Sequence, residues 1–221
     1  EVIARKSLRY APTAPKIRRT LSNLFKVCTS NDTLVVAFTG HGVQFKGENE
    51  IFYCPDDADL GDRTSMIGLQ REVLHPLERE CEARVKLLLV DASRDDPRSK
   101  TARGPRKIDL QKLNQSESMR AARGVSVFFS CSTGEAGFTH RDSSQGVFFH
   151  FLTEGLKGAA ADEDGMVTLS GLKLYVWKAV QKYVAKEFKE KQVPDLREST
   201  QGIVVLAHPK KEPPKPRKKS K

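Results

Sequence analysis

Two apolar segments, each followed by a chemically distinctive residue, constrain this chain most. Residues 34–38 lead into Thr-Gly-His41-Gly, and residues 86–90 lead into Asp-Ala-Ser93-Arg. Short apolar runs of this kind are typical of buried strands. Ligands of parallel sheets bind beyond the carboxyl ends of the strands, so we expect His41 and Ser93 to lie together at one such edge.

Strand and helix signals alternate along the rest of the chain. Thr13 is placed to cap one helix with apolar residues at helical spacing, and Ser170 is placed to cap a longer amphipathic helix. Further helices are expected over 72–82 and 148–156, and further strands over 51–55, 125–130 and 203–206. This alternation favours an α/β fold with a mostly parallel sheet flanked by helices, a three-layer sandwich.

The charge of the chain is concentrated at its end. Residues 210–221 hold seven basic residues and one glutamate, which is +6 of the formal net charge of +10. We therefore predict one domain over residues 1–208 and a disordered basic tail over 209–221. The tail could contact nucleic acid or anionic lipid through its charge, or it could be a solvated tail or linker.

The cysteines are spread along the chain. Cys28, Cys54, Cys81 and Cys131 form no C-x-x-C pair, which indicates neither a disulfide scaffold nor a metal site. A reducing, cytoplasmic setting is expected. No apolar run is long enough to span a membrane, so no transmembrane segment is predicted.

The motifs together resemble the caspase and metacaspase family, in particular its bacterial caspase-like branch. His41 precedes Ser93 by 52 residues, close to the spacing of about 50 between the caspase histidine and nucleophile. Residues 130–134, 146–156 and 164–169 are also similar to that branch, and the likeness covers residues 11–207. The family's first strand and helix are not recognised, so an N-terminally truncated caspase-like fold is expected.

The resemblance implies a role for each site residue. His41 is expected to act as general acid and base, and the Gly42 N–H to help stabilise the oxyanion with the N–H of residue 93. Asp91 matches the acid that selects arginine or lysine at the cleaved position, and a carboxylate suits such charge-assisted bonds. The alternative for Asp91 is a strand-end carboxylate that accepts loop N–H bonds.

Ser93 departs from the family, which has cysteine at this position. A thiol ionises near neutral pH, whereas a serine hydroxyl needs a well-oriented base, so we expect peptidase turnover to fall by several orders of magnitude. An engineered substitution and a natural pseudopeptidase that binds peptides without cutting them both remain open. A third possibility is an interaction module that acts through the basic tail.

Three other segments carry secondary expectations. Cys131 follows a strand but is expected to be a buried, inert cysteine. The exposed loop over 95–123 is rich in arginine and lysine, so self-processing there and solvated loop charge are both open. The acidic run 55–59 could bind an activating calcium ion or be a simple acidic turn, and no cofactor or metal site is predicted.

Overall fold

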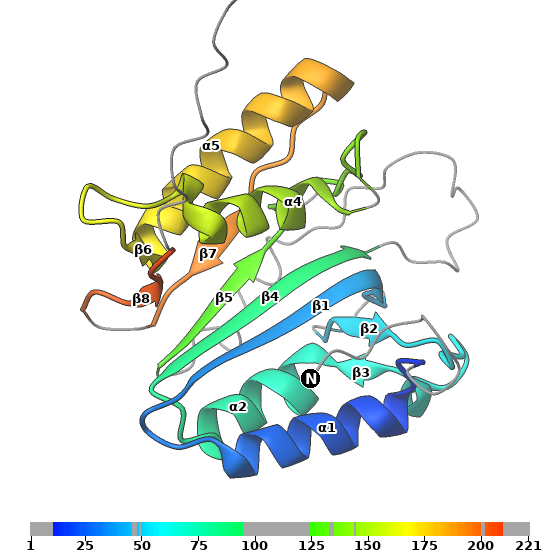
Figure 1. Ribbon diagram of the computed structural model, residues 1–221. Helices are drawn as coiled ribbons and strands as arrows, with labels where there is room; N and C mark the ends of the chain where they lie inside the picture. The colour runs from blue at the N-terminus through cyan, green and yellow to red at the C-terminus, as the bar shows by residue number, and fades with distance from the viewer. Residues whose placement is uncertain are drawn as a thin grey trace, which may run out of the picture.

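A computed structural model of the protein describes residues 11–45, 48, 50–94, 124–132, 135–143, 145–199 and 202–209. Within them, six strands form one sheet in the order β3-β2-β1-β4-β5-β7 (Figure 1). The helices are α1 (Ala14–Val27), α2 (His75–Arg79), α4 (Val147–Glu154) and α5 (Leu169–Phe188). The strands are β1 (Thr33–Val43), β2 (Phe52–Cys54), β3 (Ile67–Gly68), β4 (Val85–Arg94), β5 (Val125–Phe129), β6 (Val167–Thr168), β7 (Asp195–Arg197) and β8 (Val205–Ala207).

The sheet is the middle of three layers, which confirms the expected sandwich. Helices α1 and α2 cover one face, and α4 and α5 cover the other (Figure 1). Alternation along β4 sends side chains to both layers, because Leu88 packs in the core beside α1 while Leu87 and Leu89 pack in the core beside α4 and α5. Both faces of β4 and β5 are therefore apolar, as the near-continuous hydrophobic runs of these strands predicted.

The sheet is mixed, which refines the expectation of a mostly parallel one. β1, β4 and β5 run parallel in the centre, whereas β2, β3 and β7 pair antiparallel. The connection from β1 to β2 spans only residues 44–51, and a parallel crossover needs about a dozen residues or more. The short connection therefore forces β2 to turn back along β1.

Several expected boundaries moved. The helix expected over 72–82 is a π-helical turn, Leu69–Leu74, followed by α2. The strand expected over 203–206 does not extend the main sheet, because β8 pairs with β6 in a separate two-stranded sheet. In the part of the chain that the structure describes, no helix combines the length and the apolar character needed to cross a bilayer.

The helix caps differ from those expected. Thr13 occupies the N-cap of α1 without a side-chain bond, and the first N–H of the helix, on Ala14, donates instead to Asp57 Oδ1 at 2.8 Å. The N-cap of α5 is Thr168, not Ser170, and its hydroxyl accepts a bond from the Gly171 N–H at 3.0 Å. The sequence pattern located both helices but not the groups that cap them.

Replacing Thr168 by alanine is expected to lower the free energy of unfolding by about 1 kcal/mol, because it removes the side-chain acceptor at the N-terminus of α5. Urea unfolding followed by circular dichroism would measure this loss. Thr153→Ala is the matched control, since the Thr153 hydroxyl bonds the Phe149 carbonyl inside α4 and caps no helix. Equal losses in the two variants would show that the Thr168 bond is not a cap.

Candidate active site at the carboxyl ends of the central strands

His41 and Ser93 lie side by side at the carboxyl ends of β1 and β4. The two strands pair in parallel from Thr33 opposite Val85 to Gly42 opposite Arg94, and in this register His41 is opposite Ser93. The imidazole of His41 is exposed. Gly42 is buried, with Tyr53 opposite it on β2 and Arg94 opposite it on β4. The tertiary structure thus brings together the residues that two separate motifs nominated.

Asp91 lies two residues before Ser93, and two glycines, Gly137 and Gly146, approach its half-buried carboxylate. We call Asp91 and the residues around its carboxylate the Asp91 recess. A β-carbon added to Gly146 would overlap the Asp91 carboxylate, and one added to Gly137 would come within 3.4 Å of Asp91 Oδ1. The Ser130 hydroxyl hydrogen-bonds the same carboxyl group. Burial raises the pKa of the Asp91 carboxyl group above its usual range, and the Ser130 bond offsets part of this increase.

The recess lies at the boundary between a covered and an uncovered part of the sheet. On the α4 side, Ser130 at the end of β5 is only 2% exposed, whereas Val35 on β1 is 49% exposed. Thr39, also exposed, lies opposite Asp91 in the β1–β4 register. The half-buried Asp91 thus has an exposed neighbour on its β1 side, Thr39, and a buried neighbour on its β5 side, Ser130.

The sequence reasoning missed four residues of this recess: Thr39, Ser130, Gly137 and Gly146. Thr39 precedes His41 by two residues just as Asp91 precedes Ser93, and Ser130 and Gly146 begin two of the segments that resemble the family. On parallel strands this spacing places Thr39 and Asp91 on the same face. The other three residues reach the site through tertiary contacts across the sheet.

Cys54, rather than Cys131, is the cysteine nearest to the histidine in the sheet. Cys54 on β2 lies opposite His41 in the antiparallel β1–β2 register. Burial raises the pKa of the Cys54 thiol, which disfavours the reactive thiolate. Cys131 is 6% exposed and its thiol contacts the Glu135 carbonyl oxygen at 3.4 Å, in agreement with the expected buried cysteine.

Two carboxylates of the acidic run 55–59 accept bonds from backbone N–H groups. Asp57 accepts from the first N–H of α1, and Asp59 Oδ1 accepts from the Gly61 N–H at 2.8 Å. Among the described residues, no group of three or more histidine, cysteine or acidic side chains is arranged to hold a metal ion. These contacts assign Asp57 to the N-terminus of α1 and Asp59 to a turn.

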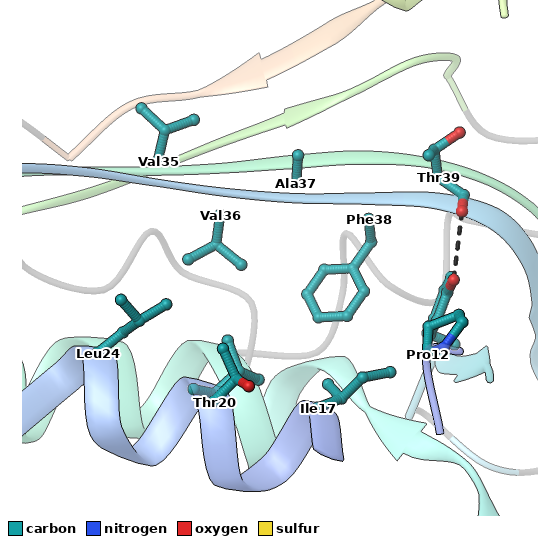
Figure 2. Close-up of a pocket in the computed structure, with 11 residues that line it drawn as sticks. Pro12, Ile17, Thr20, Leu24, Val35, Val36, Ala37, Phe38 and Thr39 are labelled. Atoms are coloured by element: carbon teal, nitrogen blue, oxygen red, sulfur yellow. Dashed lines mark hydrogen bonds between the residues drawn. The ribbon is translucent and has the colours of Figure 1, made fainter. Parts of the chain in front are cut away.

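A separate groove of about 170 Å³ lies between β1 and α1. Val36 and Phe38 point into it toward α1, Phe38 over Ile17, whereas Thr39 points to the opposite face of the sheet (Figure 2). The Tyr53 hydroxyl closes one end with a bond to the Thr39 carbonyl at 3.3 Å. The groove is therefore on the far side of the sheet from the Asp91 recess.

Fold and site together define an α/β domain of the caspase type, with histidine and a small polar residue on adjacent strand ends. The family model for the caspase domain matches residues 5–202, and the chain belongs to this family. The crystal structure of caspase-1 from Spodoptera frugiperda is similar, with a TM-score of 0.55 and 18% sequence identity over 90% of this chain and 73% of that one. The search of curated proteins found no match.

Removing the Asp91 carboxylate is expected to make stability less dependent on pH. Because the folded-state pKa is raised, the folded protein keeps this proton at pH values where the unfolded chain has lost it, and stability falls as pH rises through that interval. Asp91→Asn should remove this fall and raise the free energy of unfolding at neutral pH by about 1 kcal/mol. Urea titrations at a series of pH values measure it, and an unchanged profile would contradict the assignment.

Proposed function

We propose that this domain is a caspase-type endopeptidase scaffold whose recess selects an arginine or lysine side chain. The observation that carries the proposal is the β1–β4 register, which pairs His41 with Ser93 and sets Asp91 two residues earlier on the same strand. A half-buried carboxylate beside the exposed Thr39 of β1 suits a long basic side chain with an apolar stem. Membership of the caspase-domain family supports a protein or peptide as the substrate.

In the proposed reaction, His41 takes the proton from the nucleophile at position 93 as its oxygen or sulfur attacks the scissile carbonyl carbon. The N–H groups of Gly42 and residue 93 stabilise the negative charge on the carbonyl oxygen. His41 then gives its proton to the leaving amine, and the peptide bond breaks to leave an acyl-enzyme. A water molecule, deprotonated by His41, releases the carboxylic acid product.

Ser93 favours a second candidate, a pseudopeptidase that binds basic peptides without cutting them. Serine is a weak nucleophile unless its base is oriented by a further group. Isothermal titration of the Ser93 protein with an arginine-terminated peptide separates the two candidates when combined with an assay of cleavage. Binding that is lost in Asp91→Asn, without turnover even in Ser93→Cys, supports the pseudopeptidase. Turnover by Ser93→Cys supports the peptidase scaffold.

Other parts of the proposal rest on the sequence alone. The loop over 95–123 and residues 210–221 lie outside the described residues, so self-processing and charge-driven contacts with anionic partners remain proposals. None of the four cysteines forms a disulfide, which supports the proposed reducing, cytoplasmic setting. Calcium activation also remains a proposal, and cleavage by Ser93→Cys with and without calcium tests it.

A further inference from the structure

Gln192, which follows α5, is fully buried beside Ser130, with an exposed fraction of 0%. Its side-chain Nε2 donates to the Ser130 carbonyl at 2.9 Å, and its Oε1 accepts from the Phe138 N–H at 3.1 Å. One amide thus links the end of β5 to the loop that leads into α4. Buried amides of this kind are costly unless both ends are bonded, so the two contacts define one position for the side chain.

The hydrogen bonds of Gln192 continue to each wall of the recess. Phe138, held through its N–H, follows Gly137, and its carbonyl accepts from the Val147 N–H at 2.7 Å. Val147 in turn follows Gly146, whose lack of a side chain leaves room for the Asp91 carboxylate. The three residues around Asp91 are therefore held by this chain of bonds. Ser130 is bonded directly, whereas Gly137 and Gly146 are held through their neighbours Phe138 and Val147.

A second set of contacts fixes the same segment. The Val193 N–H bonds Glu135 Oε2 at 2.6 Å, and the Ser132 hydroxyl donates to the Val193 carbonyl at 2.9 Å. Lys191 pairs with the other Glu135 oxygen at 3.4 Å. Residues 191–193 therefore hold residues 130–132 and 135–138 at several points, and Gln192 is the one that bonds Ser130 and Phe138.

We propose that Gln192 is a positioning residue that sets the width of the Asp91 recess and thereby its selectivity for a basic side chain. The inference rests on the proposed function, since it concerns the same recess. If the amide is lost, Ser130 and the glycine-bearing loop are free to shift relative to Asp91. The carboxylate then no longer meets an incoming guanidinium at a fixed place, and arginine loses its advantage over an uncharged side chain.

The test uses the full chain with Ser93 and compares Gln192→Met with Gln181→Met. Methionine has a similar length but makes neither bond, and Gln181 is a partly exposed control whose Nε2 donates to the Trp177 carbonyl within α5. Two quantities are measured: the rate at which iodoacetamide labels Cys131, located by peptide mass spectrometry, and the affinity for an arginine peptide relative to its norleucine counterpart. Loss of a buried hydrogen bond predicts about tenfold faster labelling and about tenfold less selectivity for arginine in Gln192→Met only.

The two measurements separate the possible failures. Unchanged labelling of Cys131 overturns the inference, and so does faster labelling with unchanged selectivity, because Gln192 would then support the fold alone. If the Ser93 protein shows no preference for arginine, the proposed function fails, and labelling alone decides whether Gln192 holds the wall of the recess.

If Gln192→Met does not fold, Gln192→Glu replaces it. Its carboxylate still accepts from the Phe138 N–H, and protonation restores a donor for the Ser130 carbonyl. The rate of Cys131 labelling in Gln192→Glu, divided by the rate in the protein with Gln192, should therefore fall as the pH is lowered. A ratio that does not change with pH would contradict the inference.

Discussion

Replacement of Ser93 by cysteine is expected to raise the rate of arginine-peptide cleavage by roughly three orders of magnitude or more. Cysteine reacts as a thiolate that forms near neutral pH, so His41 alone suffices as its partner. A serine hydroxyl at the same place depends on a base that a third group orients. The measurement is kcat/KM on a fluorogenic peptide with arginine at the cleaved position, for the Ser93 and Ser93→Cys proteins side by side.

Two further variants make this comparison specific. His41→Ala in the Ser93→Cys protein should remove the gain, because His41 lies opposite position 93 in the β1–β4 register. Cys54→Ser should leave the gain intact, although Cys54 lies opposite His41 on the other side, because burial keeps its thiol protonated. Equal cleavage by the Ser93 and Ser93→Cys proteins, lost in Cys54→Ser, would instead make Cys54 the nucleophile.

Asp91→Asn, introduced into the Ser93→Cys protein, is expected to lower kcat/KM for the arginine peptide by about 10²–10³-fold. The carboxylate is half-buried in a glycine-flanked recess, where a bond to guanidinium is charge-assisted and poorly screened. Cleavage of a peptide with norleucine at the same position should change little, because that side chain gains nothing from the charge. The ratio of the two kcat/KM values is therefore the quantity to measure.

Asp195→Asn is the matched control for this loss of charge. Asp195 lies on β7, where its carboxylate bonds Arg197 at 3.2 Å. We expect this variant to keep the preference for arginine. If Asp91→Asn lowers cleavage of both peptides equally, the carboxylate supports the site without selecting the substrate, and the alternative of a strand-end acceptor for loop N–H groups gains support.

Raising the pH should also strengthen the preference for arginine in the Ser93→Cys protein. Burial raises the pKa of the Asp91 carboxyl group, so this group keeps its proton to a higher pH than a free aspartate does. While it is protonated, it cannot form an ion pair with arginine. The kcat/KM ratio of arginine to norleucine peptides should increase as the pH rises through this pKa. A ratio that is constant with pH would show that Asp91 does not meet the arginine side chain.

Local sequence was sufficient for the three central strands and for the residues at their ends, but it did not predict β3, β6 or β7. Continuous apolar character identified β4 and β5, because strands buried on both faces have little room for polar residues. It also identified β1, although the face of β1 that carries Val35 and Thr39 is exposed. Since a strand end is defined by the chain itself, the position of His41, Ser93 and Asp91 at strand ends followed directly. The order of strands and helices similarly indicated the three layers.

Only the tertiary structure decided what surrounds these residues. The antiparallel direction of β2 and the placement of Cys54 beside His41 depend on a short connection whose path has no periodic signal. Gln192 reaches the Ser130 carbonyl across 62 residues, and Gly146 approaches Asp91 from a different layer of the fold. Periodicity reports which face of an element is buried, but not which distant element covers it. The walls of the recess therefore had to come from the structure, whereas the His41–Ser93 pair and Asp91 could be predicted from the sequence.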